Sequence, residues 1–275
     1  MTAPPILGYH KIDSRFELGF TQLGPRTFRR QIETLARAGY RTLGSAELLA
    51  AVGRTGGRAD GAAAPALPRS HAPAIVLTFD DGYAALAEHA FPVLADHGFR
   101  ALLFVITDFV GRENTWDVQY GWRRFYHLSW DELAKWRERG IEVHSHGATH
   151  ARLTWLSDTE AETELGRSRE AIASRVGEAP RGIGYPFGAA DERVCRLAAT
   201  AGYTLGFGGP VGAGTSDPML LERRVVYGWD RGGIPYVLRD GGVGQLARSL
   251  ARTTNRCAVG TAAIQRLLGR RYRGA

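Results

Sequence analysis

Short apolar runs alternate with amphipathic stretches along most of this chain, and this alternation restricts its fold more than any other feature. The apolar runs have the length of buried strands, and the stretches between them have the spacing of helices with one apolar face. Strands are expected at residues 5–9, 41–43, 75–79, 101–106, 141–144, 182–185, 203–207 and 224–226. Helices are expected at residues 25–38, 84–97, 130–139, 158–176 and 190–201. Since strands that alternate with helices pair in parallel, the chain is predicted to be an α/β protein with a barrel-like sheet.

Length and composition predict one domain rather than two. A chain of 275 residues, 44% of them hydrophobic, can bury a substantial single core, and no internal repeat suggests a solenoid. We expect the domain to span residues 1–240, with an insert at about 53–73. The insert is rich in glycine, alanine and proline, which bury too little apolar surface to offset the entropy of ordering. It is therefore predicted to be a mobile surface loop.

Residues 241–275 are predicted to form a basic helical C-terminal extension. The net charge is +7, and arginines in this segment contribute part of the excess. A helix at 262–272 would place its apolar residues on one side with arginines around them, so it could contact an anionic membrane or a phosphorylated substrate. We favour a solvated basic surface on a helix that docks on the barrel. Nucleic-acid binding is not expected, because no motif supports it.

Two adjacent carboxylates follow an apolar strand in the sequence Thr78-Phe79-Asp80-Asp81-Gly82. The carboxyl ends of strands are where α/β barrels place their chemistry. Successive side chains at a strand end diverge, so one carboxylate can bind a cation while the other stays free to accept a proton.

Two histidines four residues apart, His146 and His150, follow a later strand. On a helical turn or in a compact loop, this spacing brings both imidazole rings to one side. One carboxylate and two neutral imidazoles suit Zn²⁺ or a related divalent ion, and they leave positions open for water and substrate. The two motifs together predict a metal site with its own base.

These motifs resemble those of the NodB-homology polysaccharide deacetylases, carbohydrate esterase family 4, in the branch with a Y-P-F-G motif. The first motif, T-F-D-D-G, is present letter for letter, and the second keeps its histidine spacing with Gly147 in place of the usual hydroxyl residue. The third motif, at residues 184–188, reads G-Y-P-F-G and lacks the arginine of the common R-P-P-Y-G pattern. The resemblance covers most of residues 5–230.

The resemblance implies a single distorted (β/α) barrel of about seven strands. It also implies a metal-dependent hydrolase that removes an N-acetyl group from an amino sugar or sugar conjugate. Asp81, His146 and His150 would hold one divalent ion, zinc ahead of cobalt, nickel or manganese, and Asp80 would be the base. Two alternatives stay open. The substrate could be a non-sugar amide or imide, or the chain could be a non-catalytic carbohydrate-binding relative, as the absent arginine suggests.

The general acid that protonates the leaving amine is expected to be His10. Many relatives place this acid on a late histidine, but this chain has no histidine after His150. In a closed barrel the first and last strands are neighbours, so a histidine that ends the first strand can occupy the same position. His144, on the same strand face as His146, is the second choice.

Substrate contacts are expected from aromatic residues and from the third motif. Tyr185 ranks first as a sugar-stacking face because it lies within that motif. Arg224 follows a late strand and could orient catalytic groups. The predicted substrate-binding residues are Tyr185, Pro186, Phe187, Gly188, Trp116 and Arg224.

Neither a membrane-spanning stretch nor the charged start and apolar core of a secretory signal is found in the sequence. We therefore expect a cytoplasmic protein, which favours an intracellular sugar conjugate over a finished cell-wall polymer. The cysteines, Cys195 and Cys257, form no metal-binding pattern.

Overall fold

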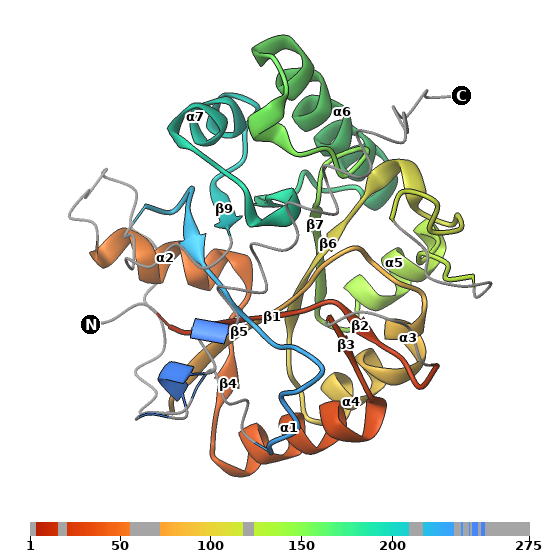
Figure 1. Cartoon of the computed structure of the whole chain (residues 1–275), viewed down its shortest axis with the longest axis vertical. Coiled ribbons are helices and arrows are strands. Elements are labelled where there is room, and N and C mark those ends of the chain that lie inside the picture. The colour runs from red at the N-terminus through yellow and green to blue at the C-terminus, as the bar shows by residue number, and fades with distance from the viewer. Residues whose placement is uncertain are drawn as a thin grey trace.

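A parallel sheet dominates the computed structural model, which describes residues 4–15, 21–55, 72–117, 124–208, 217–233, 238, 242, 244–246 and 249–250. Its strands are β1 (Ile6–Tyr9), β4 (Arg41–Thr42), β5 (Ala74–Phe79), β6 (Ala101–Val105), β7 (Ile141–Ser145), β8 (Gly182–Gly184), β9 (Leu205–Gly208), β10 (Leu221–Glu222) and β11 (Arg224–Val225). Their order is β10-β9-β8-β7-β6-β5-β1-β11, and β4 pairs with β5. The short strands β2 (Lys11–Ile12) and β3 (Gln22–Leu23) form a separate pair. Helices surround the sheet (Figure 1).

The sheet closes on itself through one segment near the C-terminal end of the described chain. β10 and β11 are separated only by Arg223, and they pair with opposite ends of the sheet. Leu221 lies opposite Phe207 of β9, while Arg224 lies opposite Leu7 of β1. The result is the expected distorted (β/α) barrel. If β10 and β11 are taken as one segment and β4 is left aside, the described strands occupy seven positions around the barrel axis. As expected from closure, the first strand neighbours the last.

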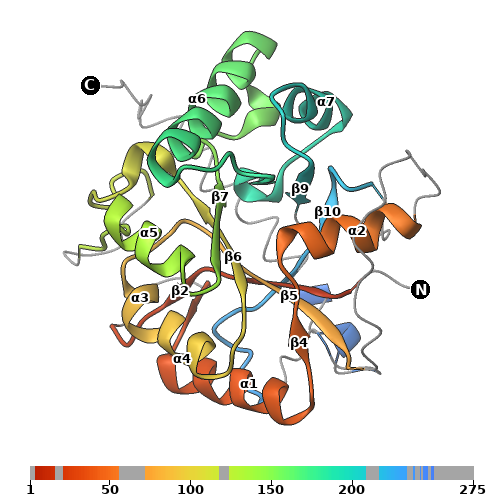
Figure 2. The ribbon, with the colours of Figure 1, turned by 180° about the vertical axis from the view of Figure 1, so that it is seen from behind.

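The helices form the outer layer, seen from both sides in Figures 1 and 2. They are α1 (Pro25–Arg37), α2 (Ser45–Thr55), α3 (Ala85–His89), α4 (Phe91–Asp96), α5 (Trp130–Arg137), α6 (Asp158–Val176) and α7 (Glu192–Thr200). Three short 3₁₀ turns are η1 (Thr107–Phe109), η2 (Leu153–Trp155) and η3 (Pro186–Gly188). Reciprocal capping boxes begin α5 and α6, where a serine at each N-cap pairs with a glutamate three residues later.

Two helix predictions need correction. The helix expected at 84–97 is divided into α3 and α4 at Ala90, because Pro92 lacks the N–H that would continue the ladder and its ring clashes with the preceding turn. The helix α2 was not expected and reaches Thr55, so the first residues of the predicted insert at 53–73 are helical. Residues 56–71 lie outside the described residues, as does most of the predicted extension at 241–275.

Strand alternation decides which side chains reach the barrel interior. Tyr9 of β1 and Phe79 of β5 point outward, where both rings pack on Phe28 of α1 at centroid distances of 5.3 and 5.8 Å. Because successive side chains on a strand alternate, the next residues in the chain, His10 and Asp80, face inward at the carboxyl end of the barrel. The same alternation places Glu142 and His144 of β7, and His146 just after it, in one inward row.

The described helices include none with both the length and the apolar character required to cross a bilayer.

Candidate active site

The first motif ends β5 with two carboxylates that turn in different directions. The backbone N–H of Asp80 donates to the carbonyl of Tyr9 at 2.9 Å, which continues the β1–β5 ladder. Asp81 then leaves the strand with a φ of 69°, a left-handed conformation that aspartate tolerates better than most residues. Both carboxylates are buried. They therefore belong to the interior of the site rather than to an exposed turn.

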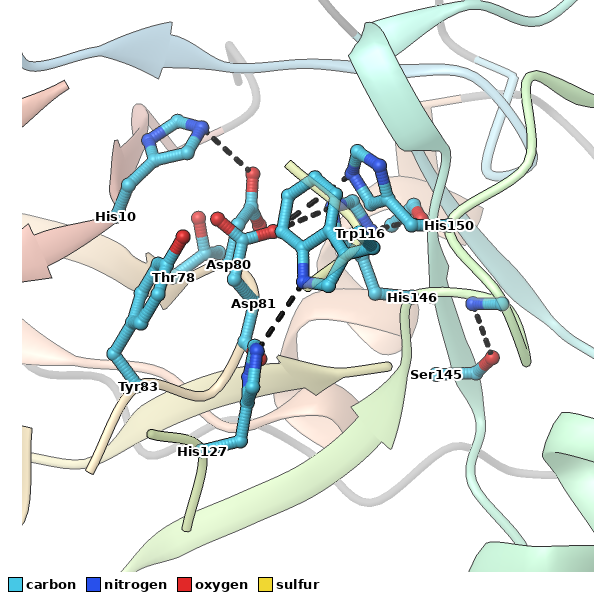
Figure 3. A network of polar contacts seen from close by, with 12 residues as sticks. His10, Thr78, Asp80, Asp81, Tyr83, Trp116, His127, Ser145, His146 and His150 are labelled. Carbon is cyan, nitrogen blue, oxygen red and sulfur yellow. Dashed lines mark hydrogen bonds and ion pairs between the residues drawn. The ribbon is translucent and has the colours of Figure 1, made fainter. Parts of the chain in front are cut away.

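The structure brings Asp81, His146 and His150 together. One potential ligand atom from each lies within 4.8 Å of the others, and all three residues are buried. The Asp81 Oδ1 atom is 3.5 Å from Nε2 of His146 and 3.8 Å from Nε2 of His150 (Figure 3). His150 has a φ of 64°, so the two histidines are joined by a compact loop rather than a helical turn.

The third motif fixes the orientation of His146. Its Nδ1–H donates to the carbonyl of Gly184 at 2.6 Å, which leaves Nε2 unprotonated and directed at Asp81. A Cβ at position 184 would lie 2.8 Å from the Phe104 ring and 3.2 Å from Nδ1 of His146. Glycine is therefore required for this close approach of backbone to imidazole.

A buried carboxylate on α6 holds the loop between the two histidines. The Oε1 atom of Glu164 accepts hydrogen bonds from the backbone N–H and the hydroxyl of Thr149, at 2.6 and 3.0 Å. Gly147 has a φ of 82°, and a Cβ there would lie 3.0 Å from the same Glu164 oxygen. The close carboxylate explains why this chain has glycine where the related motif usually has a hydroxyl residue.

The electrostatics of the three residues suit a bound cation. Burial, and then the negative charge of Asp80, raise the pKa of Asp81 well above its ordinary value. Burial lowers the pKa of both His146 and His150, so the imidazoles are neutral, as metal ligands must be. A divalent cation would supply the nearby positive charge that an ionised Asp81 carboxylate needs in this buried position. The donor set of one oxygen and two nitrogens fits Zn²⁺ and similar ions.

Asp80 has different partners. Its Oδ1 atom accepts a hydrogen bond from Nη1 of Arg223 at 2.5 Å, and both side chains are 3% exposed. Its Oδ2 atom is 3.4 Å from Nε2 of His10. Burial alone would raise the pKa of Asp80, but the nearby charge of Arg223, reinforced by His146 and His10, holds it below the ordinary range. Asp80 is therefore an ionised carboxylate outside the ligand group.

Arg223 was missed by the sequence-based prediction, which chose the adjacent Arg224. Arg223 lies between β10 and β11, in the segment that closes the barrel, and its guanidinium also stacks over the Phe104 ring at 5.4 Å. Arg224 belongs to β11 and is only half-buried. The third motif of this chain lacks the arginine of the common pattern, and Arg223 donates a guanidinium hydrogen bond to Asp80 from the segment between β10 and β11. The signal in the sequence that could have indicated Arg223 is its position just before the short apolar strand of residues 224–226.

The two histidine candidates for the general acid lie in different places. His10 contacts Asp80, whereas Nε2 of His144 is 3.5 Å from Oε2 of Glu142, further down the barrel interior. Ring burial lowers the pKa of His10 to about 4, although the charge of Asp80 opposes this shift. His10 is therefore neutral near pH 7. Because His10 contacts Asp80 and His144 contacts Glu142 instead, the geometry favours His10.

Some of the predicted substrate-binding residues lie in the core, and others contact the site. Tyr185 is fully buried, and its hydroxyl donates to the carbonyl of Met219 at 2.9 Å, so its ring offers no face to a sugar. Pro186 is also buried, while Gly188 is half-buried at the end of η3. Phe187 and Trp116 pack against the His150 ring, with centroids 4.7 and 4.1 Å away.

Backbone strain marks the same place. Within the described residues, the non-glycine residues with left-handed φ values are Asp81, His150 and Phe187, at 69°, 64° and 61°. Such conformations cost of order 1 kcal/mol each and persist only where the surroundings enforce them. All three belong to the site.

Comparisons with known proteins identify relatives of this chain. A family model described as polysaccharide deacetylase matches residues 68–206. YxkH of Bacillus subtilis (strain 168), a polysaccharide deacetylase by name, is 26% identical over 216 residues, which cover 78% of this chain and 67% of YxkH.

Two solved structures share the fold. The Streptococcus pyogenes deacetylase PplD, in complex with acetate, has a TM-score of 0.69 at 21% identity and covers 82% of this chain and 92% of its own. IcaB from Ammonifex degensii has a TM-score of 0.67 at 22% identity and covers 91% of this chain and 97% of its own. The family match spans half of the chain and contains both adjacent carboxylates and both histidines of the site. The chain belongs to the polysaccharide deacetylase family.

Proposed function

We propose that the protein hydrolyses the N-acetyl group of an amino sugar or sugar conjugate, and that it does so with one divalent ion held by Asp81, His146 and His150. Membership of the polysaccharide deacetylase family supports the reaction class. The observation that carries the proposal is Asp80, a buried and ionised carboxylate that lies beside the ligand group but has its own partners. A binding protein has no need for such a base.

The reaction has three chemical requirements. An N-acetyl group is a poor electrophile with a poor leaving group, so hydrolysis needs an activated water, stabilisation of the oxyanion, and a proton for the departing amine. Asp81, His146 and His150 would hold a divalent cation, which would supply Lewis acidity for the acetyl carbonyl and for the attacking water. The remaining tasks belong to side chains of this protein.

Asp80 takes the proton from the attacking water in this proposal. The guanidinium of Arg223 fixes one of its oxygens, so the other oxygen, Oδ2, is directed toward His10. Because Arg223 and its neighbours keep Asp80 ionised, the carboxylate can act as a base at neutral pH.

His10 delivers a proton to the leaving amine. It is neutral in the resting protein, so it must first gain a proton, and Asp80 is a group within reach that can supply one. Transfer from Oδ2 of Asp80 to Nε2 of His10 returns the base to its ionised form. The proton taken from water thus leaves with the amine product.

Zinc is the ion we propose, since one carboxylate and two imidazoles are typical of catalytic zinc sites with open positions. Cobalt, nickel and manganese are the alternatives that the same donor set accepts.

Acetate release from a substrate panel tests the proposal. Metal-stripped protein is reloaded with Zn²⁺ or Co²⁺ and incubated with N-acetylglucosamine oligomers, nucleotide-linked N-acetyl sugars and simple non-sugar amides. Acetate release is expected from the sugar substrates alone, and Asp80→Asn serves as the matched inactive protein. Turnover of the non-sugar amides alone would redirect the proposal to the other amide hydrolases. No acetate from any substrate would overturn it.

A further inference from the structure

His127 contacts the site from a segment to which the family motifs assign nothing. It is 3% exposed, and its backbone N–H donates to the carbonyl of Arg112 at 2.9 Å. The residues around it, 126–128, pair with the chain immediately after Asp81 through hydrogen bonds from Ala84 to Tyr126 and from Leu128 to Gly82, at 2.8 and 2.9 Å. The ring of His127 also stacks on Tyr83, with centroids 5.1 Å apart. Its position is therefore fixed by both backbone and ring packing.

The hydrogen bonds of His127 determine its tautomer. The indole Nε1–H of Trp116 can only donate, and it lies 3.2 Å from Nε2 of His127, so Nε2 must be the unprotonated acceptor. The proton is then on Nδ1, which donates to the backbone carbonyl of Asp81 at 2.8 Å. Both ring nitrogens are satisfied, each in one direction only. His127 is thus held as the neutral tautomer with its proton on Nδ1, and neither ring nitrogen is free for proton transfer.

The chain of contacts continues from Trp116 to the second histidine ligand. Nδ1 of His150 is buried and has no hydrogen-bond partner among the described residues, unlike Nδ1 of His146. The orientation of His150 therefore depends on ring packing, to which Trp116 contributes at a centroid distance of 4.1 Å (Figure 3). Trp116 is itself 4% exposed, and its hydrogen bond to His127 restricts how the indole can turn.

We propose that His127 and Trp116 form a positioning pair that holds Asp81 and His150 in the geometry needed to bind the metal. His127 holds the strained backbone of Asp81, and through Trp116 it orients the imidazole of His150. Two ligands from different loops are thereby coupled through one buried imidazole. The inference rests on the proposed metal site but not on the identity of the substrate. Outer partners of this kind typically change metal affinity by about 10- to 100-fold when they are removed.

Metal affinity without substrate tests this pair. The dissociation constant for Zn²⁺ and the visible spectrum of the Co²⁺ form are measured for wild type, His127→Phe and Trp116→Phe. His127→Phe keeps the ring that stacks on Tyr83 but removes both hydrogen bonds, so Zn²⁺ affinity is expected to fall by about 10- to 100-fold. Trp116→Phe is expected to weaken affinity less and to alter the Co²⁺ spectrum. The double variant should bind about as weakly as His127→Phe alone, because coupled residues are not additive.

Trp136→Phe is the matched control, since it makes the same change at a buried indole that packs on Phe91 of the core. It should lower the unfolding temperature without changing Zn²⁺ affinity. His127→Asn and His127→Gln test the two hydrogen bonds of His127 separately, because each amide can replace one of the two ring nitrogens. They also carry the test if His127→Phe does not fold.

The outcomes separate this inference from the proposed function. Wild-type Zn²⁺ affinity in folded His127→Phe, or losses that multiply in the double variant, would overturn the positioning pair and leave the deacetylase proposal intact. A wild-type protein that binds no divalent ion would overturn both.

Discussion

Asp80 and Asp81 are adjacent in the chain, yet their side chains have opposite electrostatic surroundings. Asp80 faces the guanidinium of Arg223, which holds its pKa low against the effect of burial. Asp81 is buried beside the charge of Asp80 and faces two neutral imidazoles, so its pKa is raised. Divergence of neighbouring side chains at a strand end makes this possible. The two carboxylates can therefore have separate roles, one as base and one as ligand.

Substitution of each carboxylate by its amide should separate these roles. Asp80→Asn keeps the shape of the side chain but cannot accept a proton, so turnover should fall by roughly a hundredfold or more while metal content is unchanged. Asp81→Asn should weaken metal binding as well. Metal content and acetate release are measured on the same preparations. Loss of metal in Asp80→Asn with retention in Asp81→Asn would reverse the assignment.

The buried Arg223–Asp80 ion pair should also contribute to stability when only one partner is removed. Arg223→Met leaves an unpaired buried carboxylate, which is expected to lower the free energy of unfolding by about 3 kcal/mol. The double variant Arg223→Met/Asp80→Asn should recover part of this loss, because no isolated charge remains. Urea denaturation measures both, with Arg224→Met as the neighbouring control. A double variant less stable than Arg223→Met would contradict the ion-pair account.

Among the elements, β7 connects the site to the opposite end of the barrel. Its inward row begins at Glu142, which accepts a hydrogen bond from the backbone N–H of Ser45 at 3.0 Å, and ends at His146, one of the three proposed metal ligands. Burial opposes ionisation of Glu142, but the nearby His144 ring and the hydrogen bond from Ser45 outweigh it and lower the pKa to about 2. The same strand thus carries a structural carboxylate near its start and is followed directly by a proposed metal ligand.

The Glu142 carboxylate gives a stability that depends on pH. Its pKa falls from 4.5 in the unfolded chain to about 2 in the folded protein, so the stabilisation is present above pH 4.5 and is lost as pH falls toward 2. The shift corresponds to about 3 kcal/mol at neutral pH. The stability difference between wild type and Glu142→Gln should therefore shrink by about 1 kcal/mol between pH 7 and pH 4. The exposed Glu178→Gln is the control, and a difference independent of pH would contradict the account.

Elements built from local sequence signals could be predicted, and those that depend on distant contacts could not. The apolar strand β5 and the helix α6 follow from their residues alone. The helix α2 continues past Gly53 because Leu48 and Val52 are buried in the core, which outweighs the low helix propensity of glycine.

The same distinction holds for the site. The proposed ligand residues lie in two short motifs, whereas Arg223 is separated from Asp80 by 143 positions in the chain. The contact depends on which strand closes the barrel, and sequence periodicity does not encode that choice. Tyr185 was misjudged for a related reason, since membership of a motif does not reveal whether the ring or the backbone faces the site.

At the scale of the whole molecule, barrel closure assembles the site from both ends of the domain. The segment that contains β10 and β11 pairs with β9 on one side and β1 on the other. This brings Arg223 and His10 to opposite oxygens of Asp80. His10, which directly follows the first strand, thus contacts Asp80 and is the group we propose as the general acid.

His10 should matter most when the leaving group needs a proton. His10→Ala should keep its metal and its fold but lose roughly a hundredfold or more in turnover of an N-acetyl sugar, the usual effect of removing a general acid. An activated ester has a leaving group that barely needs a proton, so its hydrolysis should suffer much less. Equal losses on the two substrates would indicate positioning instead, and no loss on either would return the role to His144.

The central claim is that Asp81, His146 and His150 hold the ion on which hydrolysis depends. The most direct measurement is the metal content of purified wild type and of the double variant His146→Ala/His150→Ala, with acetate release recorded in parallel. Wild type should hold about one divalent ion per chain and lose activity when the ion is removed by a chelator, and the double variant should have neither metal nor turnover. Unchanged metal content and acetate release in a folded double variant would contradict the account.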